Sequence, residues 1–344
     1  MAVSLSVNLG GLTMKNPVTT ASGTYASGRE YAAFVDPALL GAVTTKGVSL
    51  NGWAGNDAPR IAETPSGMLN SIGLQNPGVE VLKSRDLPWL RQQDATVIVN
   101  VSGHSIDEYV AVIESLEETD DVDAYEVNIS CPNVDSGGLT FGTDVAMVQQ
   151  VVSECRKRTK RPLFVKLTPN VTDITEIAKA AEAAGADAIS LINTLLGMAI
   201  DARKKKPVLA RVVGGLSGPA VKPVALRMVL QVHKAVSVPI LGMGGIVYGT
   251  DAVEFMLAGA TAVAVGTGNF MNPCATLEVI SGIESYCEEM GVADVNDLIG
   301  ALECYISIPS TEKTASSLPS TAIALAPLSL RTCSRARLRG SRWA

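Results

Sequence analysis

Residues 238–269, VPILGMGGIVYGTDAVEFMLAGATAVAVGTGN, contain one complete copy of the pattern that decides the fold. Two short apolar runs, 238–245 and 262–269, each contain a glycine-rich turn where the run ends. Between them, DAVEFMLAGA has apolar residues at helical spacing and ends at glycine, as helices commonly do. The stretch therefore predicts a strand, a helix and a second, parallel strand.

The same unit recurs along the rest of the chain. Amphipathic stretches separate most of the strand-like runs, and one of them opens with Ser105 and places Glu108 at the spacing of a capping box. The eight predicted strands are residues 16–23, 41–47, 96–103, 124–132, 162–170, 188–195, 238–245 and 262–269. Eight such units predict an α/β fold, a (β/α)8 TIM barrel, and a doubly wound sheet is the alternative.

Four segments fall outside this repeat. SLSVNLGGLTM predicts an N-terminal hairpin that turns at Gly10-Gly11 and caps the amino-end face of the barrel. Residues 48–95 and 196–218 are insertions after the second and sixth strands, and we expect both as loops at the carboxyl-end face. Residues 1–304 are predicted to form a single catalytic domain. The basic, Ser/Ala/Pro/Arg-rich stretch 305–344 is predicted to be a disordered tail.

Composition excludes several classes of protein. Of the 344 residues 47% are hydrophobic, enough for a large core, and the net charge of −6 argues against nucleic-acid binding. The six cysteines are scattered without a CxxC pair, which argues against a zinc ribbon or a cysteine-held iron–sulfur cluster and fits a reducing cytoplasm. The N-terminus has no signal-peptide pattern. The uncharged stretch 255–277 contains breakers of a membrane helix, so we expect a cytoplasmic protein without membrane contact.

The carboxyl ends of the predicted strands carry the candidate site, because barrels of this kind build their sites there. Glycine-rich turns after the seventh and eighth strands predict a phosphate site, although such turns can also be plain connections. Lys46 and Lys166 end two further strands. Three interpretations of these lysines stay open: solvated loop lysines, Schiff-base lysines, or part of a flavin site. The polar and glycine residues at strand ends are Ser22, Lys46, Asn100, Asn128, Cys131, Lys166, Asn193, Thr194, Gly244, Gly245, Gly266 and Thr267.

The types of side chain near the strand ends indicate which substrate the site binds. The amides of Asn70, Asn128, Asn133 and Asn193 match a cyclic imide or a carboxylate, although a single asparagine near a turn is often only a turn former. Cys131 precedes a proline at a strand end and can act as a base or a nucleophile once it is deprotonated. The two histidines, His104 and His233, are interpreted as surface or structural residues. This disfavours a Cys–His hydrolase, and no metal site stands out.

Nine motifs together closely resemble the dihydroorotate dehydrogenase family over residues 4–303. They are TTKG, ETPSGMLNSIGLQNPG, NISCPNV, FGTD, VKLTPNVTDI, INTL, GGLSGPAVKPVAL, GMGGI and VAVGT. The motif IGLQNPG and the active-site cysteine resemble class 1, type 1B, the NAD-linked catalytic subunit. Fumarate-using class 1A relatives share the cysteine, and another FMN-barrel dihydropyrimidine oxidoreductase is a further alternative.

This resemblance implies roles for individual residues. Cys131 is implied as the catalytic base in the oxidation of dihydroorotate to orotate in pyrimidine biosynthesis, with hydride passing from C6 to N5 of FMN. The residues implied to bind FMN are Ser22, Lys46, Asn100, Asn128, Lys166, Ile192, Gly218, Gly244, Gly245, Gly266 and Thr267. The residues implied to bind substrate are Lys46, Asn70, Ser71, Ile72, Gly73, Leu74, Asn128, Asn133, Asn193 and Thr194.

The resemblance also implies partners. It implies an electron-transfer subunit that carries FAD and a [2Fe–2S] cluster and passes electrons to NAD⁺. It further implies a heterotetramer built on a catalytic homodimer.

Overall fold

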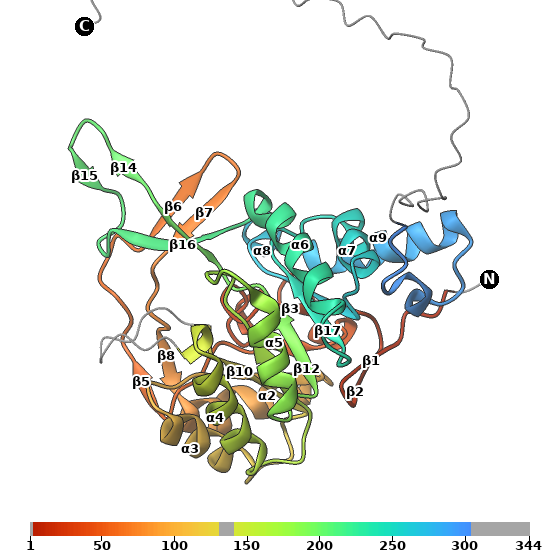
Figure 1. The fold of residues 1–344 in the computed structure, drawn as a ribbon, viewed down its shortest axis with the longest axis horizontal. Helices are drawn as coiled ribbons and strands as arrows, with labels where there is room; N and C mark the ends of the chain where they lie inside the picture. The colour runs from red at the N-terminus through yellow and green to blue at the C-terminus, as the bar shows by residue number, and fades with distance from the viewer. Residues whose placement is uncertain (1–2, 131–140, 304–344) are drawn as a thin grey trace, which may run out of the picture. The chain divides into compact units, whose positions relative to one another are not determined.

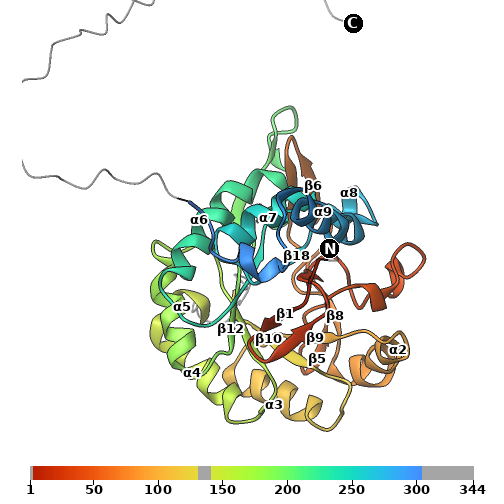
Figure 2. The same cartoon turned by 90° about the vertical axis from the view of Figure 1, so that its right-hand side faces the viewer.

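The computed structural model describes residues 3–130 and 141–303 of the chain. The predictions for Cys131, Asn133 and the stretch 305–344 therefore lie outside the described residues. Figure 1 gives the fold, and Figure 2, turned by 90°, shows the helices arranged in a ring around the strands.

An eight-stranded parallel sheet forms the centre of the protein and confirms the predicted barrel. Its first and last strands approach each other through the Thr19–Ala42 bridge, which brings the barrel close to closure. The strands, in chain order, are β3 (Val18–Thr20), β4 (Val43–Thr44), β9 (Val97–Val101), β10 (Ala124–Asn128), β11 (Leu163–Lys166), β12 (Ala188–Leu191), β17 (Ile240–Met243) and β18 (Ala262–Val265). Each is shorter than its predicted run, because the residues that follow the paired core leave the sheet to build the loops at its carboxyl end.

Helices cover the outside of the barrel, so both faces of every barrel strand are buried. These helices are α3 (Ile106–Leu116), α4 (Val145–Arg156), α5 (Ile174–Ala183), α6 (Lys222–His233), α7 (Gly249–Leu257) and α9 (Ala275–Met290). The helical segment before β9 comprises α1 (Val79–Val81), η3 (Leu82–Asp86) and α2 (Leu87–Gln92). After β3 the chain forms only the 3₁₀ turns η1 (Arg29–Tyr31) and η2 (Pro37–Leu39). The remaining short helices are η4 (Phe141–Thr143), η5 (Pro219–Val221), α8 (Gly268–Met271) and η6 (Val295–Leu298).

A local sequence signal places the start of α3 correctly. Ser105 caps α3 by accepting a hydrogen bond from the backbone N–H of Glu108, as predicted. The second half of the predicted capping box differs, because the Glu108 carboxylate accepts from the N–H of His104, one residue earlier than in the standard motif. The stretch 255–277 contains the end of α7, then β18, then α8 and the start of α9. Within the described residues no helix is long and apolar enough to cross a membrane.

The N-terminal hairpin lies at the amino-end face, as predicted. β1 (Val7–Leu9) and β2 (Leu12–Met14) pair antiparallel around the turn at Gly10-Gly11. Gly10 has φ +56°, and a Cβ there would clash with the backbone carbonyl of Asp187, which directly precedes β12. The hairpin therefore packs closely against the start of the barrel strands and leaves their carboxyl ends open for a site.

The two insertions combine into one structure, which the sequence did not predict. In the first, β6 (Ile61–Thr64) and β7 (Gly67–Asn70) form a hairpin, and β5 (Asn51–Trp53) pairs with β8 (Asn76–Gly78). The second contains β13 (Leu195–Met198), β14 (Ile200–Asp201), β15 (Lys206–Pro207) and β16 (Val213–Ser217). β16 pairs with β7, which joins both insertions in a four-stranded sheet of order β13-β16-β7-β6. We call this sheet, with the β14–β15 hairpin, the arm (Figure 1).

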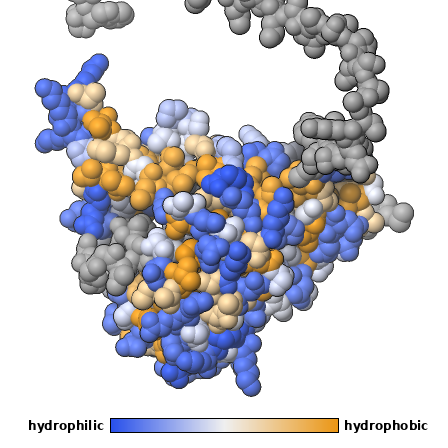
Figure 3. Space-filling view, viewed as in Figure 1, coloured by the Kyte–Doolittle hydropathy of each residue, from blue (hydrophilic) through white to orange (hydrophobic). Residues whose placement is uncertain are grey.

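The arm carries exposed apolar side chains. Figure 3 shows apolar residues gathered below the hydrophilic end of the β14–β15 hairpin. The exposed apolar residues of the arm are Ile61, Leu196, Met198, Ile200, Val212 and Val213. Contiguous exposed apolar surface is unusual for a protein that does not associate with others.

The contact between α7 and α9 generates a stability prediction. A Cβ on Gly282 of α9 would lie 2.8 Å from Cα and 3.1 Å from N of Gly249, the first residue of α7. Backbone atoms cannot move aside as a flexible side chain would, and overpacking costs about 1–3 kcal/mol. We expect Gly282→Ala to lower the free energy of unfolding by about 1–2 kcal/mol in urea denaturation, although alanine gains about 1 kcal/mol in helix propensity. The exposed neighbour Ser281→Ala should stay within about 0.5 kcal/mol of wild type. A Gly282→Ala protein as stable as wild type would mean that the two helices can move apart.

Candidate functional site

A cavity of about 1720 Å³ lies between the carboxyl ends of the barrel strands and the arm. It exceeds the roughly 300–1000 Å³ of a site for one small molecule, so it has room for a cofactor and a substrate ring side by side. Every predicted site residue within the described ranges lines this cavity. These residues are Ser22, Lys46, Asn70, Ser71, Ile72, Gly73, Leu74, Asn100, Asn128, Lys166, Ile192, Asn193, Thr194, Gly218, Gly244, Gly245, Gly266 and Thr267.

Lys166 brings a buried positive charge to the floor of the cavity. It is the last residue of β11, is only 5% exposed, and donates a hydrogen bond to Ser22 Oγ at 3.4 Å. Apolar side chains of Ile192 and Met243 lie along the same floor. Because burial of an ammonium group is costly, Lys166 favours a ligand that carries negative charge or electron-rich oxygen atoms.

Glycine turns form a cradle in the cavity lining, next to Ile192. Gly218, Gly244 and Gly245 have φ values of +90°, +125° and +86°, which residues with a Cβ rarely adopt. A Cβ on Gly218 would lie 2.7 Å from Gly67 Cα, so glycine is also required for the close approach of β16 to the β6–β7 hairpin. Thr267 completes this cradle by donating its hydroxyl hydrogen to Ser217 Oγ at 2.8 Å. Bare backbone in such turns can bind an anionic group such as phosphate.

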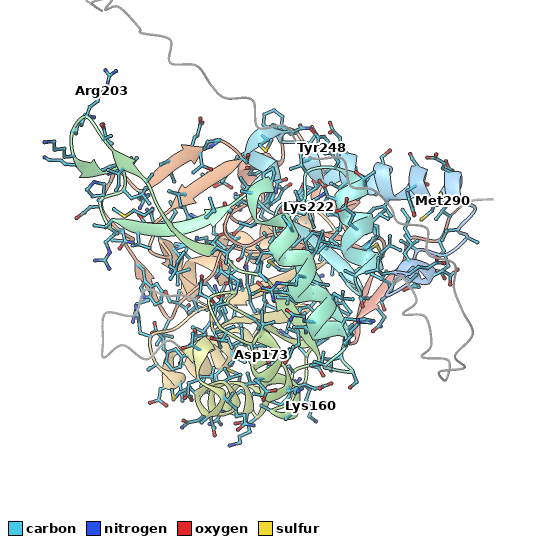
Figure 4. The ribbon with its side chains drawn as sticks, turned by 45° about the horizontal axis from the view of Figure 1, so that its top comes forward. Lys160, Asp173, Arg203, Lys222, Tyr248 and Met290 are labelled. Atoms are coloured by element: carbon cyan, nitrogen blue, oxygen red, sulfur yellow. The ribbon has the colours of Figure 1, made fainter. Side chains whose placement is uncertain are left out.

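An ion pair that the sequence did not reveal stabilises the loop that follows Gly244 and Gly245. The Asp251 carboxylate accepts hydrogen bonds from the backbone N–H groups of Val247 and Tyr248, each at 2.9 Å. Lys222, the first residue of α6, donates to Asp251 Oδ1 at 2.6 Å and lies 2.9 Å from Glu254 Oε2. Figure 4 shows Lys222 and Tyr248 at the same end of the barrel. The pair thus connects α6 to the loop that begins at the cradle.

Two amide side chains of the cavity lining are linked by hydrogen bonds. Asn128 at the end of β10 and Asn193 after β12 are joined through Ser130, whose hydroxyl donates to Asn128 Oδ1 at 2.5 Å and accepts from Asn193 Nδ2 at 2.5 Å. Asn70 belongs to the arm and donates to the carbonyl of Gly215 at 3.3 Å. Asn56 holds the segment 70–74 in place, because its Nδ2 donates to the Ser71 carbonyl at 2.9 Å.

Sequence reasoning missed Ser130 and Glu126, both of which belong to this network. Glu126 lies two residues before Asn128 on β10, so the two side chains share the inner face of the barrel. It is fully buried and accepts a hydrogen bond from Asn100 Nδ2. An acidic residue within the buried run AYEVN was the signal that could have identified it.

The histidines lie outside the cavity lining, in line with their interpretation from the sequence. The ring of His104 packs at a tilt against Trp53 with ring centroids 3.9 Å apart, and its Nδ1 lies 3.4 Å from Glu108 Oε2. His233 ends α6 and packs against Gly259 and Gly300. Among the residues that the structure describes, no group of three or more His, Cys, Asp or Glu side chains is placed to hold a metal ion.

Comparison with known proteins gives one consistent result. Residues 4–287 match the family model described as dihydroorotate dehydrogenase. The chain is 61% identical over 299 residues to the Alkaliphilus oremlandii protein named dihydroorotate dehydrogenase B (NAD(+)), catalytic subunit, covering 87% of this chain and 99% of that one. A protein of the same name from Lachnoclostridium phytofermentans is 58% identical over 301 residues, covering 88% and 100%. The crystal structure of DHODH from Eimeria tenella in complex with ferulenol has a similar fold, with a TM-score of 0.74 at 23% identity, covering 87% of this chain and 88% of that one.

The Asp251 network generates a prediction on stability and pH. Burial acts to raise the pKa of Asp251, but hydrogen bonds from Lys222, Tyr248 and Val247 outweigh it and hold the pKa below its ordinary value. The ionised form therefore stabilises the protein above about pH 4, and this stabilisation is lost as the pH falls through the lowered pKa. We expect Asp251→Asn to lower the free energy of unfolding at pH 7 by about 1–3 kcal/mol in urea denaturation. The difference from wild type should shrink below about pH 4.

Glu254→Gln is the matched control for this experiment. It removes the more exposed partner of Lys222 and leaves the backbone contacts of Asp251 intact. Its cost should stay under about 1 kcal/mol, as for a surface ion pair. Equal losses for the two variants, or a difference from wild type that does not change with pH, would contradict the assigned role of Asp251.

Proposed function

This chain belongs to the dihydroorotate dehydrogenase family, and on that premise we propose that it is the catalytic subunit of an NAD-linked dihydroorotate dehydrogenase. It oxidises dihydroorotate to orotate in pyrimidine biosynthesis. One observation carries the proposal: a buried lysine, a glycine cradle and a cluster of amide side chains line a single cavity of about 1720 Å³. A flavin and a pyrimidine ring need this combination of groups.

The residues that line the cavity fit FMN. The positive φ values at Gly218, Gly244 and Gly245 leave backbone exposed in a cradle that side chains would fill, which suits the phosphate. The apolar floor at Ile192 and Met243 suits a flat ring, and Lys166 supplies positive charge beside it. When bound, FMN would accept at N5 the hydride that leaves C6 of dihydroorotate. The proposed FMN residues are those predicted from the sequence.

A second set of residues, which shares Lys46 and Asn128 with the FMN set, binds the substrate. The carboxylate and imide oxygen atoms of dihydroorotate accept hydrogen bonds from lysine and amide N–H groups. The proposed substrate residues are Lys46, Asn70, Ser71, Ile72, Gly73, Leu74, Asn128, Asn193 and Thr194. Asn133, which lies outside the described residues, is proposed to join them.

Cys131, also outside the described residues, removes a proton from C5 of the substrate. It follows Ser130, which hydrogen bonds to Asn128 and Asn193 within the amide cluster. A C–H group next to a carbonyl is only weakly acidic, so a positioned base contributes about 10²–10⁴-fold to the rate.

We further propose a partner subunit. The printed names of the relatives call them catalytic subunits, which supports an assembly with a second chain. That chain would carry FAD and a [2Fe–2S] cluster, pass electrons to NAD⁺, and form a heterotetramer around a homodimer of this chain. The exposed apolar residues of the arm support association.

Anaerobic mixing with dihydroorotate tests the function directly. The purified protein, reconstituted with FMN, should lose its yellow colour on mixing, and orotate should form in equal amount. Reoxidation by the partner subunit with NAD⁺, and not by fumarate, would distinguish the NAD-linked enzyme from fumarate-using relatives. A yellow protein that dihydroorotate leaves unchanged, but that another dihydropyrimidine bleaches, would overturn the assigned substrate.

The thiol has a sharper test. We expect Cys131→Ala to retain FMN but to be reduced by dihydroorotate about 10²–10⁴-fold more slowly in stopped-flow absorbance, because the base is lost. Cys274→Ala is the matched control, since this half-buried thiol does not line the cavity. Unchanged reduction of Cys131→Ala would remove that residue from its role.

A further inference from the structure

A buried carboxylate with no evident task lies beneath the amide cluster. Glu126 on β10 is fully buried, and Asn100 Nδ2 donates to its Oε2 at 2.5 Å. Its other oxygen, Oε1, is buried and has no hydrogen-bond partner among the described residues. Such a group destabilises a fold unless it is paired, so packing alone does not account for it.

A continuous chain of hydrogen bonds leads from Glu126 to the cavity lining. Asn100 Oδ1 accepts a hydrogen bond from Asn128 Nδ2 at 3.4 Å. Asn128 Oδ1 in turn accepts from the hydroxyl of Ser130 at 2.5 Å and from its backbone N–H at 3.3 Å. Ser130 Oγ accepts from Asn193 Nδ2 at 2.5 Å, and Asn193 Oδ1 accepts from the N–H of Thr194 at 2.7 Å.

The carboxylate gives this chain one direction. Glu126 Oε2 accepts from Asn100 Nδ2, so the amide of Asn100 turns its NH₂ group toward Glu126 and its oxygen toward Asn128. The same logic turns the NH₂ group of Asn128 toward Asn100 and leaves its oxygen to Ser130. The amide oxygen of Asn128 accepts from Ser130, and that of Asn193 accepts from the N–H of Thr194. Each NH₂ group keeps a second hydrogen for a ligand.

We propose that Glu126 is a positioning residue that, through Asn100, Asn128 and Ser130, sets the amides of Asn128 and Asn193 as hydrogen-bond donors toward the cavity. Donors at these two positions select ligands that present carbonyl or carboxylate oxygen atoms. This inference rests on the proposed function, in which the ligand is orotate or its dihydro form. Reversal of either amide would place oxygen against oxygen, which costs the desolvation of an unpaired group.

The test compares orotate binding by FMN-loaded variants, measured from the change in flavin absorbance on titration. Glu126→Met keeps the approximate volume but removes the acceptor, so its Kd for orotate should rise about 3- to 30-fold, as expected for one or two mispaired hydrogen bonds. Glu126→Gln retains an acceptor oxygen and should recover most of the affinity. The Kd for FMN and the melting temperature are measured in parallel, because a purely structural role would change these and leave orotate binding within about twofold of wild type.

A double-mutant cycle separates the hydrogen-bond chain from a general loss of packing. Ser130→Ala breaks the same chain further along, so its effect on orotate Kd and that of Glu126→Met should be less than additive. If Glu126→Met does not fold, Glu126→Ala, which also removes the acceptor, takes its place in the cycle. Asp86→Asn serves as the control, because Asp86 is an equally buried carboxylate that pairs with Arg85 and Arg29 outside the cavity lining. It should leave the orotate Kd unchanged.

The outcomes distinguish this inference from the proposed function. A wild-type protein that binds FMN but not orotate overturns the proposed substrate, and with it the role of Glu126. Wild-type protein that binds orotate, together with additive effects in the cycle or unchanged affinity in Glu126→Met, overturns the inference alone.

Discussion

Side chains fill the interior of a closed barrel, so each polar group buried there has to pair with another group of the protein or with a ligand. This constraint governs the carboxyl end of the present barrel. Lys166, Asn100 and Glu126 project from neighbouring strands and are almost completely buried. The polar groups that are not fully hydrogen-bonded to one another face the cavity. A ligand that binds there has to meet their remaining hydrogen-bonding capacity.

The arm turns an open barrel mouth into a cavity. Its two halves come from insertions after β4 and β12, and the pairing of β16 with β7 fixes one against the other. Asn70 at the end of β7 thereby reaches the same cavity as Asn193, which lies two residues before β13. The arm therefore contributes to the binding of a ligand as well as to the shape of the protein surface.

Two parts of the cavity lining are suited to different tasks. At the cradle, glycine backbone and the Lys222–Asp251 pair provide a rigid, anion-accepting turn with few side chains. At the middle strands, amides linked by hydrogen bonds provide donors whose direction depends on a buried carboxylate. A ligand with a phosphate at one end and a flat ring at the other would meet both environments, which supports the proposed flavin mononucleotide beside a small ring.

The sequence by itself determined the order and type of the barrel elements and the cavity residues at the strand ends. Alternation of apolar strands with amphipathic helices is a local property, and in a parallel barrel it brings every strand end to one face. Residues such as Lys166 and Gly245 could therefore be assigned to the site from their positions after strands. Only the tertiary structure decided the pairing of β7 with β16, the Lys222–Asp251 contact and the chain from Glu126 to Asn193. Each of these joins residues distant in sequence, and no local pattern encodes which distant partner a buried polar group will meet.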